Sequence, residues 1–105
     1  MADVVNKGTV LDETFADTDP VTSGEFKAQD EYHMVAINVA ATTEDMALEI
    51  ELRDEEGDWH VVDTDTTLAG ETDVIVVANA GRMRVTVTPA AAPSSAKIWV
   101  RAHGG

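Results

Sequence analysis

The fold is decided by residues 46–62, which read MALEIELR (46–53), DEEGD (54–58) and WHVV (59–62). Apolar and polar side chains alternate through the first segment, which is the pattern of a strand with one buried face. The acidic segment contains Gly57, which can adopt the positive φ angle that tight turns need. Trp59 and its β-branched neighbours then read as a return strand. This stretch predicts a β-hairpin.

Similar strand patterns recur along the chain at intervals of about ten residues. We expect strands near residues 32–40, 72–78, 82–88 and 96–102, with weaker signals near 9–15 and 24–28. The 72–78 segment is Val-rich and more continuously apolar than alternating, which predicts burial on both of its faces. The fold class is therefore all-β, an antiparallel β-sandwich or small barrel of about seven to eight strands.

The expected domain spans residues 21–105, and residues 1–20 form an extended N-terminal arm or a first strand. The expected core consists of the apolar residues at alternating strand positions: Val35, Ile37, Val39, Leu48, Ile50, Leu52, Val61, Val76, Val85, Val87, Ile98 and Val100.

Composition excludes several classes of protein. The 105 residues suit one domain, and the absence of cysteine rules out disulfides and thiolate chemistry. No apolar run approaches the ~20 residues of a membrane span, and the first residues lack an export signal, so we expect a soluble chain. Twenty acids against seven Lys and Arg give a net charge of −13, which opposes general nucleic-acid binding.

The charge is also unevenly placed. Residues 1–73 hold all twenty acids and three bases, whereas residues 74–105 hold four bases and no acid. This division predicts that the C-terminal third makes a contact with a partner. The acidic, lysine-poor composition is typical of proteins from salt-loving microbes, in which salt screens self-repulsion.

The residues indicate no enzyme, no metal site and no cofactor. The serines carry no nucleophile-elbow motif, the histidines lack metal-ligand spacing, and no glycine-rich phosphate loop is present. Acid pairs such as Asp17 with Asp19 and Asp63 with Asp65 could offer oxygen ligands to calcium, but the full calcium-loop pattern is missing.

The candidate interface consists of basic residues around one tryptophan on the last two expected strands: Arg82, Arg84, Lys97, Trp99 and Arg101. If those strands are neighbours, these residues form one basic patch with an aromatic centre. Such a patch fits a protein interface, because Trp and Arg are enriched in interface hot spots. Its partner would be acidic, either a neighbouring copy or another protein. Two alternatives stay open: Trp99 lies in a covered face of a sandwich, or the arginines pair with Glu49 and Glu51.

A carbohydrate-binding or adhesion module is the alternative function. Exposed tryptophans on a β-sandwich can stack against sugar rings, and the candidates are Trp59 and Trp99. That function requires one of them in a shallow groove with polar neighbours.

Residues 48–62, with their strand, acidic turn and Trp followed by a β-branched pair, resemble small β-sandwich virion proteins of tailed viruses. Residues 82–88, RMRVTVT, are similar to the strand that follows in those proteins, and the resemblance covers about residues 32–102. It implies a non-enzymatic virion protein, such as a capsid decoration, turret or tail component. The implied partners are other copies, for example in a trimer, and a major capsid or other virion protein. With the acidic composition, it implies a virus of a halophilic archaeon.

Overall fold

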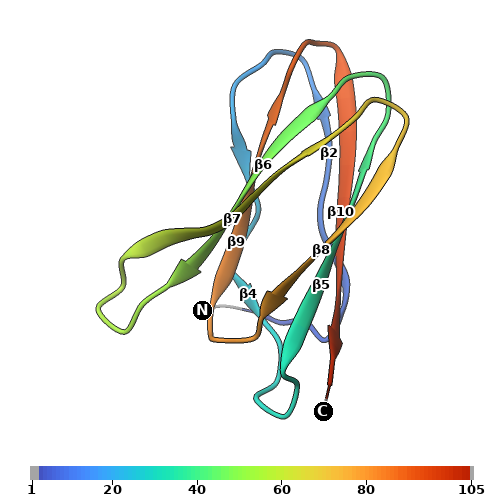
Figure 1. Ribbon diagram of the computed structural model, residues 1–105. Coiled ribbons are helices and arrows are strands. Elements are labelled where there is room, and N and C mark those ends of the chain that lie inside the picture. The colour runs from blue at the N-terminus through green and yellow to red at the C-terminus, as the bar shows by residue number, and fades with distance from the viewer. Residues whose placement is uncertain (1–2, 105) are drawn as a thin grey trace.

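The computed structural model describes residues 3–104 and contains two β-sheets packed face to face (Figure 1). Sheet A has the order β1-β4-β9-β6-β7, with β3 also paired to β9, and sheet B has the order β2-β10-β5-β8. The pairings are antiparallel except that of β1 with β4. The β-sandwich prediction is confirmed. The strands are β1 (Asp3–Val4), β2 (Lys7–Phe15), β3 (Val21–Thr22), β4 (Phe26–Lys27), β5 (Met34–Ala41), β6 (Met46–Arg53), β7 (Trp59–Thr67), β8 (Thr72–Ala78), β9 (Met83–Pro89) and β10 (Ser94–His103).

The predicted hairpin is confirmed as β6–β7, and it extends away from the rest of the sandwich (Figure 1). Its turn is closed by two backbone hydrogen bonds, from Asp54 N to Asp58 O at 2.8 Å and from Gly57 N to Asp54 O at 3.1 Å. Gly57 has a φ angle of +94°, a value that residues with a Cβ atom rarely adopt. The glycine therefore allows the tight reversal.

The core lies between the two sheets and is built from the inward rows of both. Nine of the predicted core residues are buried: Val35, Ile37, Val39, Leu48, Ile50, Val85, Val87, Ile98 and Val100. Sheet A adds Phe26, Met46 and Met83, and sheet B adds Leu11, Phe15 and Ile75. Leu52, also predicted, is half-buried at the margin of this core.

Two predicted core residues, Val61 and Val76, are exposed to 51% and 54%. Val61 lies on β7, the edge strand of sheet A, where a β-bulge turns it outward: Asp63 pairs with Ile50, but Val61 pairs with Glu51, whose side chain points outward. The inward positions Asp63 and His60 of this edge strand are exposed as well. The prediction of a doubly buried 72–78 strand is also wrong. This strand is β8, the edge of sheet B, and nothing in the described chain covers its outer face, so Val74 is 59% exposed.

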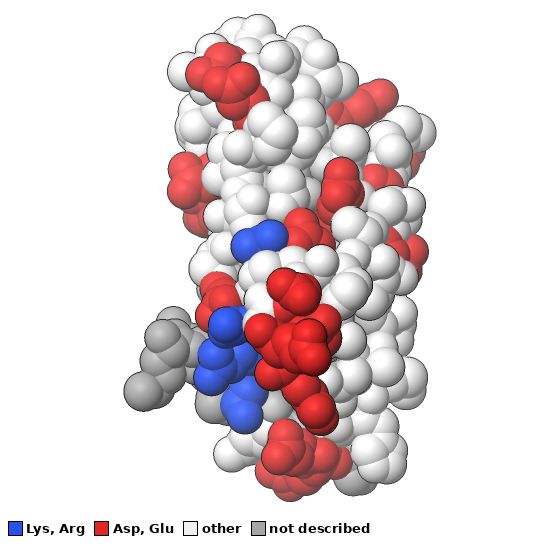
Figure 2. All heavy atoms as spheres, turned by 90° about the vertical axis from the view of Figure 1, so that its left-hand side faces the viewer, with Lys and Arg blue, Asp and Glu red and all other residues white. Residues whose placement is uncertain are grey.

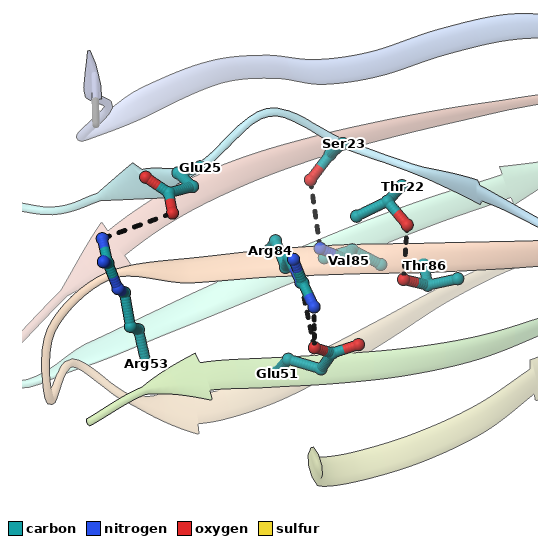
Figure 3. A network of polar contacts seen from close by, with 8 residues as sticks. All are labelled: Thr22, Ser23, Glu25, Glu51, Arg53, Arg84, Val85 and Thr86. Carbon is teal, nitrogen blue, oxygen red and sulfur yellow. Dashed lines mark hydrogen bonds and ion pairs between the residues drawn. The ribbon is translucent and has the colours of Figure 1, made fainter. Parts of the chain in front are cut away.

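Most of the expected N-terminal arm or first strand pairs with other strands of the sandwich. Lys7–Phe15 forms β2, the edge strand of sheet B beside β10. Residues 1–2 lie outside the described part of the chain. Ser23 then links β3 to the sheet: its amide donates to Val85 O at 2.9 Å, and its hydroxyl accepts from Val85 N at 3.0 Å (Figure 3).

The last two long strands are not neighbours, because β9 belongs to sheet A and β10 to sheet B. The condition for a single basic patch is therefore not met. Arg82 and Arg84 lie on the sheet A side of the sandwich, and Lys97, Trp99 and Arg101 on the outer face of sheet B. The described chain contains no helix of the length and apolarity that a membrane crossing requires.

Candidate protein-docking face

The outer face of sheet B gathers residues from four strands into transverse rows. In one row, Trp99 pairs with Thr9 on one side and Asn38 on the other, and Asn38 pairs with Val74. Rows of this kind arise because paired residues of neighbouring strands point to the same face. We call this surface the Trp99 face; its residues are Lys7, Thr9, Asp12, Ala36, Asn38, Ala40, Thr72, Val74, Val76, Lys97, Trp99 and Arg101.

Trp99 is half-buried at the centre of this face, with a hollow on either side. One hollow, of about 330 Å³, lies between Trp99, Arg101 and Val74. The other, of about 400 Å³, lies between Trp99, Lys97 and Thr9. The next strand, β5, contributes only alanine and asparagine to these rows, and such short side chains leave the surroundings of the indole ring open.

Asn38 contributes to the local order around Trp99. Its side-chain amide donates to the backbone oxygen of Trp99 at 3.3 Å. The pairing of β10 with β2 is also irregular at Trp99, since Ile98 pairs with Leu11 but Trp99 pairs with Thr9. A bulge of this kind increases the local twist and can reorient a side chain.

The charge on this face contrasts with the rest of the molecule. Lys7, Lys97 and Arg101 are exposed there, and Asp12, the register partner of Lys97, is the one acid in its rows. Among the side chains of residues 5–104, the ion pairs involve Arg53, His60 and Arg84, and none involves these three cations. The Trp99 face is therefore a cationic and partly apolar surface on a strongly acidic chain.

Arg84 lies on the outer face of sheet A and is held by internal contacts (Figure 3). Its Nε and Nη2 atoms donate to Glu51 Oε2 at 2.9 and 2.7 Å. Its guanidinium carbon lies 4.2 Å from the centre of the Trp59 ring, which is a cation–π contact. The sequence left two roles open for Arg84, an interface contact or an intramolecular ion pair. In the structure it forms the intramolecular pair with Glu51.

Arg82 also lies far from Trp99. It is exposed and lines a hollow of about 420 Å³ together with Arg53 and the acidic turn 54–57. Arg53 itself pairs with Glu25 at 3.6 Å. Figure 2, seen from the side to which the hairpin projects, shows acids spread over that face and basic side chains confined to a small part beside them.

The tip of the β6–β7 hairpin is an ordered acidic turn. Asp54 Oδ1 accepts from the amides of Glu56 and Asp58, both at 2.9 Å, and its Oδ2 lies 2.7 Å from His60 Nε2. The hydrogen bond from His60, followed by those from the two amides, holds the pKa of Asp54 below its ordinary value of 3.8. Asp54 thus stays ionised and organises the turn.

The two candidate carbohydrate-binding tryptophans lie on opposite sheets. Trp59 belongs to β7 of sheet A, where the Arg84 guanidinium covers one side of its ring. Trp99 has open hollows and polar neighbours on sheet B. The described residues include no group of three or more His, Asp or Glu side chains arranged to hold a metal ion.

Of the Trp99 face, only Lys97, Trp99 and Arg101 were among the predicted interface residues. Lys7, Asn38 and Val74 are among those that the sequence did not indicate. Lys7 is brought beside Arg101 by the pairing of β2 with β10, which lie at opposite ends of the chain. No local pattern signals such a pairing. Val74 was assigned to a buried strand because residues 74–78 are continuously apolar, but it lies on the uncovered outer face of β8.

No protein-family model and no curated protein matches the sequence. Solved structures do match. The PBSX exported protein XepA superposes with a TM-score of 0.77 at 12% identity, over 94% of this chain and 37% of XepA, so this chain spans little more than a third of that protein. PirA matches with a TM-score of 0.58 at 12% identity, over 96% of both chains. The SPBc2 prophage-derived protein YomS gives 0.58 at 13% identity, over 91% of this chain and 90% of YomS. The chain therefore has a β-sandwich fold that is also found in phage-derived proteins.

Proposed function

We propose that this chain is a non-enzymatic structural protein of a virus particle, which docks onto an acidic protein surface through the Trp99 face. The observation that carries the proposal is a half-buried tryptophan between Lys97 and Arg101, with hollows on both sides. The phage-derived origin of XepA and YomS supports a viral setting.

The chemistry of the face favours a protein partner. Trp and Arg side chains contribute most to many protein interfaces, because they combine large apolar area with directed polar contacts. Three cations without an ion partner in the described chain favour an acidic surface, which would also speed the encounter. The net charge of −13 opposes a polyanion such as nucleic acid as the partner.

Within a particle, we propose that the chain is a capsid decoration or turret component. It would assemble as an oligomer on a shell that is itself acidic. The resemblance of residues 48–62 and 82–88 to tailed-virus virion proteins supports this more specific role.

The test is to purify particles of the virus or prophage that encodes the chain and to search them for it by mass spectrometry. We expect the chain in the particles. Stripped particles should rebind the wild-type chain and the control variant Arg82→Glu, but not Lys97→Glu combined with Arg101→Glu. Absence from the particles, or equal rebinding of all variants, would refute the proposal.

The acidic composition supports a halophilic archaeal host as a further part of the proposal. The twenty acids outnumber the seven bases, so the chain repels itself at low salt through its net charge of −13. At 1 M salt the Debye length falls to ~3 Å, and this repulsion is screened. We expect the fold to be lost as salt is removed. A circular dichroism spectrum that is unchanged between multimolar and millimolar salt would contradict this part.

Carbohydrate binding is the second candidate, favoured by the two hollows beside Trp99 and by polar neighbours such as Thr9 and Asn38. The variant Trp59→Phe makes Trp99 the sole tryptophan, so its fluorescence reports on this face. Titration with glycans that shifts this emission would favour the carbohydrate function over protein docking. No change with any glycan would exclude it.

A further inference from the structure

We infer that the Trp99 face of one copy binds the β6–β7 hairpin tip of a second copy, so that the chain associates head to tail. The hairpin tip is the turn Asp54–Asp58. This inference rests on the face identified in the proposed function, but it does not depend on a viral setting.

The two surfaces are complementary in charge. At the tip, Glu55, Glu56 and Asp58 are exposed, and among the side chains of residues 5–104 no ion pair involves them. Asp54 is the tip acid whose two oxygens are engaged internally. The Trp99 face presents three cations that equally lack an ion partner in the described chain: Lys7, Lys97 and Arg101. Each surface also carries one opposite charge, because exposed Arg82 lines the hollow beside the tip and exposed Asp12 pairs in register with Lys97. Acids remain in excess at the tip, and cations remain in excess on the Trp99 face.

The shape of the tip suits insertion beside Trp99. The hairpin projects from the sandwich (Figure 1), and the face on that side carries many acidic side chains, with a smaller group of basic ones beside them (Figure 2). The hydrogen bonds of Asp54 and the positive φ angle of Gly57 hold the turn in one conformation. A preformed element loses little conformational entropy on binding, which favours association.

The contact must join two molecules, because the hairpin belongs to sheet A and the Trp99 face is the outer surface of sheet B. A head-to-tail contact repeats, so it closes into a ring or continues as a filament. In an open assembly, the terminal copy keeps a free Trp99 face. That free face is the one available to an acidic shell.

The test measures self-association by analytical ultracentrifugation at the lowest salt at which circular dichroism shows a folded domain. The face variant combines Lys97→Glu with Arg101→Glu, and the tip variant combines Glu55→Lys with Glu56→Lys. We expect each variant alone to associate at least about tenfold more weakly than the wild type, because like charges then meet at the contact. An equimolar mixture of the two variants should associate again, since each then offers a surface of opposite charge to the other.

The control variant combines Asp17→Lys with Asp19→Lys, which reverses two exposed acids in a different turn and should associate like the wild type. Wild-type association should weaken as salt rises, because the charges are screened. A monomeric wild type, or a mixture that does not recover, would overturn the inference. Association that survives in both variants would also overturn it. Pairing of two copies through the exposed edge of β8 is one contact that would give this result.

The failure of this inference is distinguishable from that of the proposed function. If the face variant loses particle binding while self-association is unchanged, the inference is wrong and the proposed function stands. If the charge-swap behaviour is found but the chain is absent from particles, the inference stands and the viral function is wrong.

Discussion

Replacing Thr67 by valine should stabilise the protein. Thr67 lies on β7 opposite Met46 and is fully buried, at 0% exposure. Its hydroxyl oxygen is buried and has no hydrogen-bond partner among the described residues. Valine has nearly the same shape and is also β-branched, so it suits the strand and places a methyl group where the hydroxyl was.

The magnitude follows from the cost of an unsatisfied buried polar group, about 1–3 kcal/mol. Removing the hydroxyl at Thr67 eliminates this cost, so we expect the free energy of unfolding to rise by about 1–3 kcal/mol. In a domain of about this size, each kcal/mol raises the Tm by roughly 4–8 °C.

The assay is urea denaturation followed by circular dichroism. The urea midpoints of the wild type and the variant are compared, and the slope of unfolding free energy against urea concentration should be the same for both. The matched control is Thr86→Val, because the Thr86 hydroxyl lies 2.9 Å from the Thr22 hydroxyl (Figure 3). That variant should be neutral or lose about 0.5–1.5 kcal/mol. A Thr67→Val chain that is less stable than the wild type would refute the reasoning, because it would mean that the hydroxyl is satisfied.

Three other predictions concern the hairpin and the core. Gly57→Ala should cost about 1 kcal/mol or more in unfolding free energy, because alanine is strained at the φ angle of +94°; an unchanged urea midpoint would contradict this. The pKa of Asp54 lies below 3.8 in the folded chain, so its carboxylate stabilises the turn above that pH, and this contribution is lost as the pH falls through the lowered pKa. NMR titration of the Asp54 carboxyl should show the lowered pKa, and His60→Ala should move it toward the ordinary value. Ile50→Ala should cost about 2–5 kcal/mol, whereas Val61→Ala, at an exposed site, should stay within about 0.5 kcal/mol; similar losses at both sites would contradict the observed bulge.

Local pattern was sufficient where the signal is local. The alternation in 46–53 and the turn at Gly57 predicted β6, β7 and their connection, because a period of two and a positive φ angle depend on adjacent residues. The strand near 96–102 was found for the same reason, and its alternation correctly separated inward Ile98 from outward Trp99.

The failures occur where side-chain position depends on distant partners. Val61 was assigned to the core because the alternation was continued past an unforeseen bulge in β7. Val76 was assigned to it because a continuous apolar run cannot distinguish a central strand from an edge strand with an open face. Both errors follow from pairing that the local sequence does not encode.

The sequence by itself determined the strand content, the hairpin, the acidic charge of −13 and the outward position of Trp99 between Lys97 and Arg101. Only the tertiary structure decided which candidate residues share a surface. It assigned β9 and β10 to different sheets, engaged Arg84 with Glu51, and brought Lys7 from the first long strand beside Arg101. The physical reason is that sheet order is set by packing two apolar faces together across the whole chain, whereas alternation records only which side each residue faces.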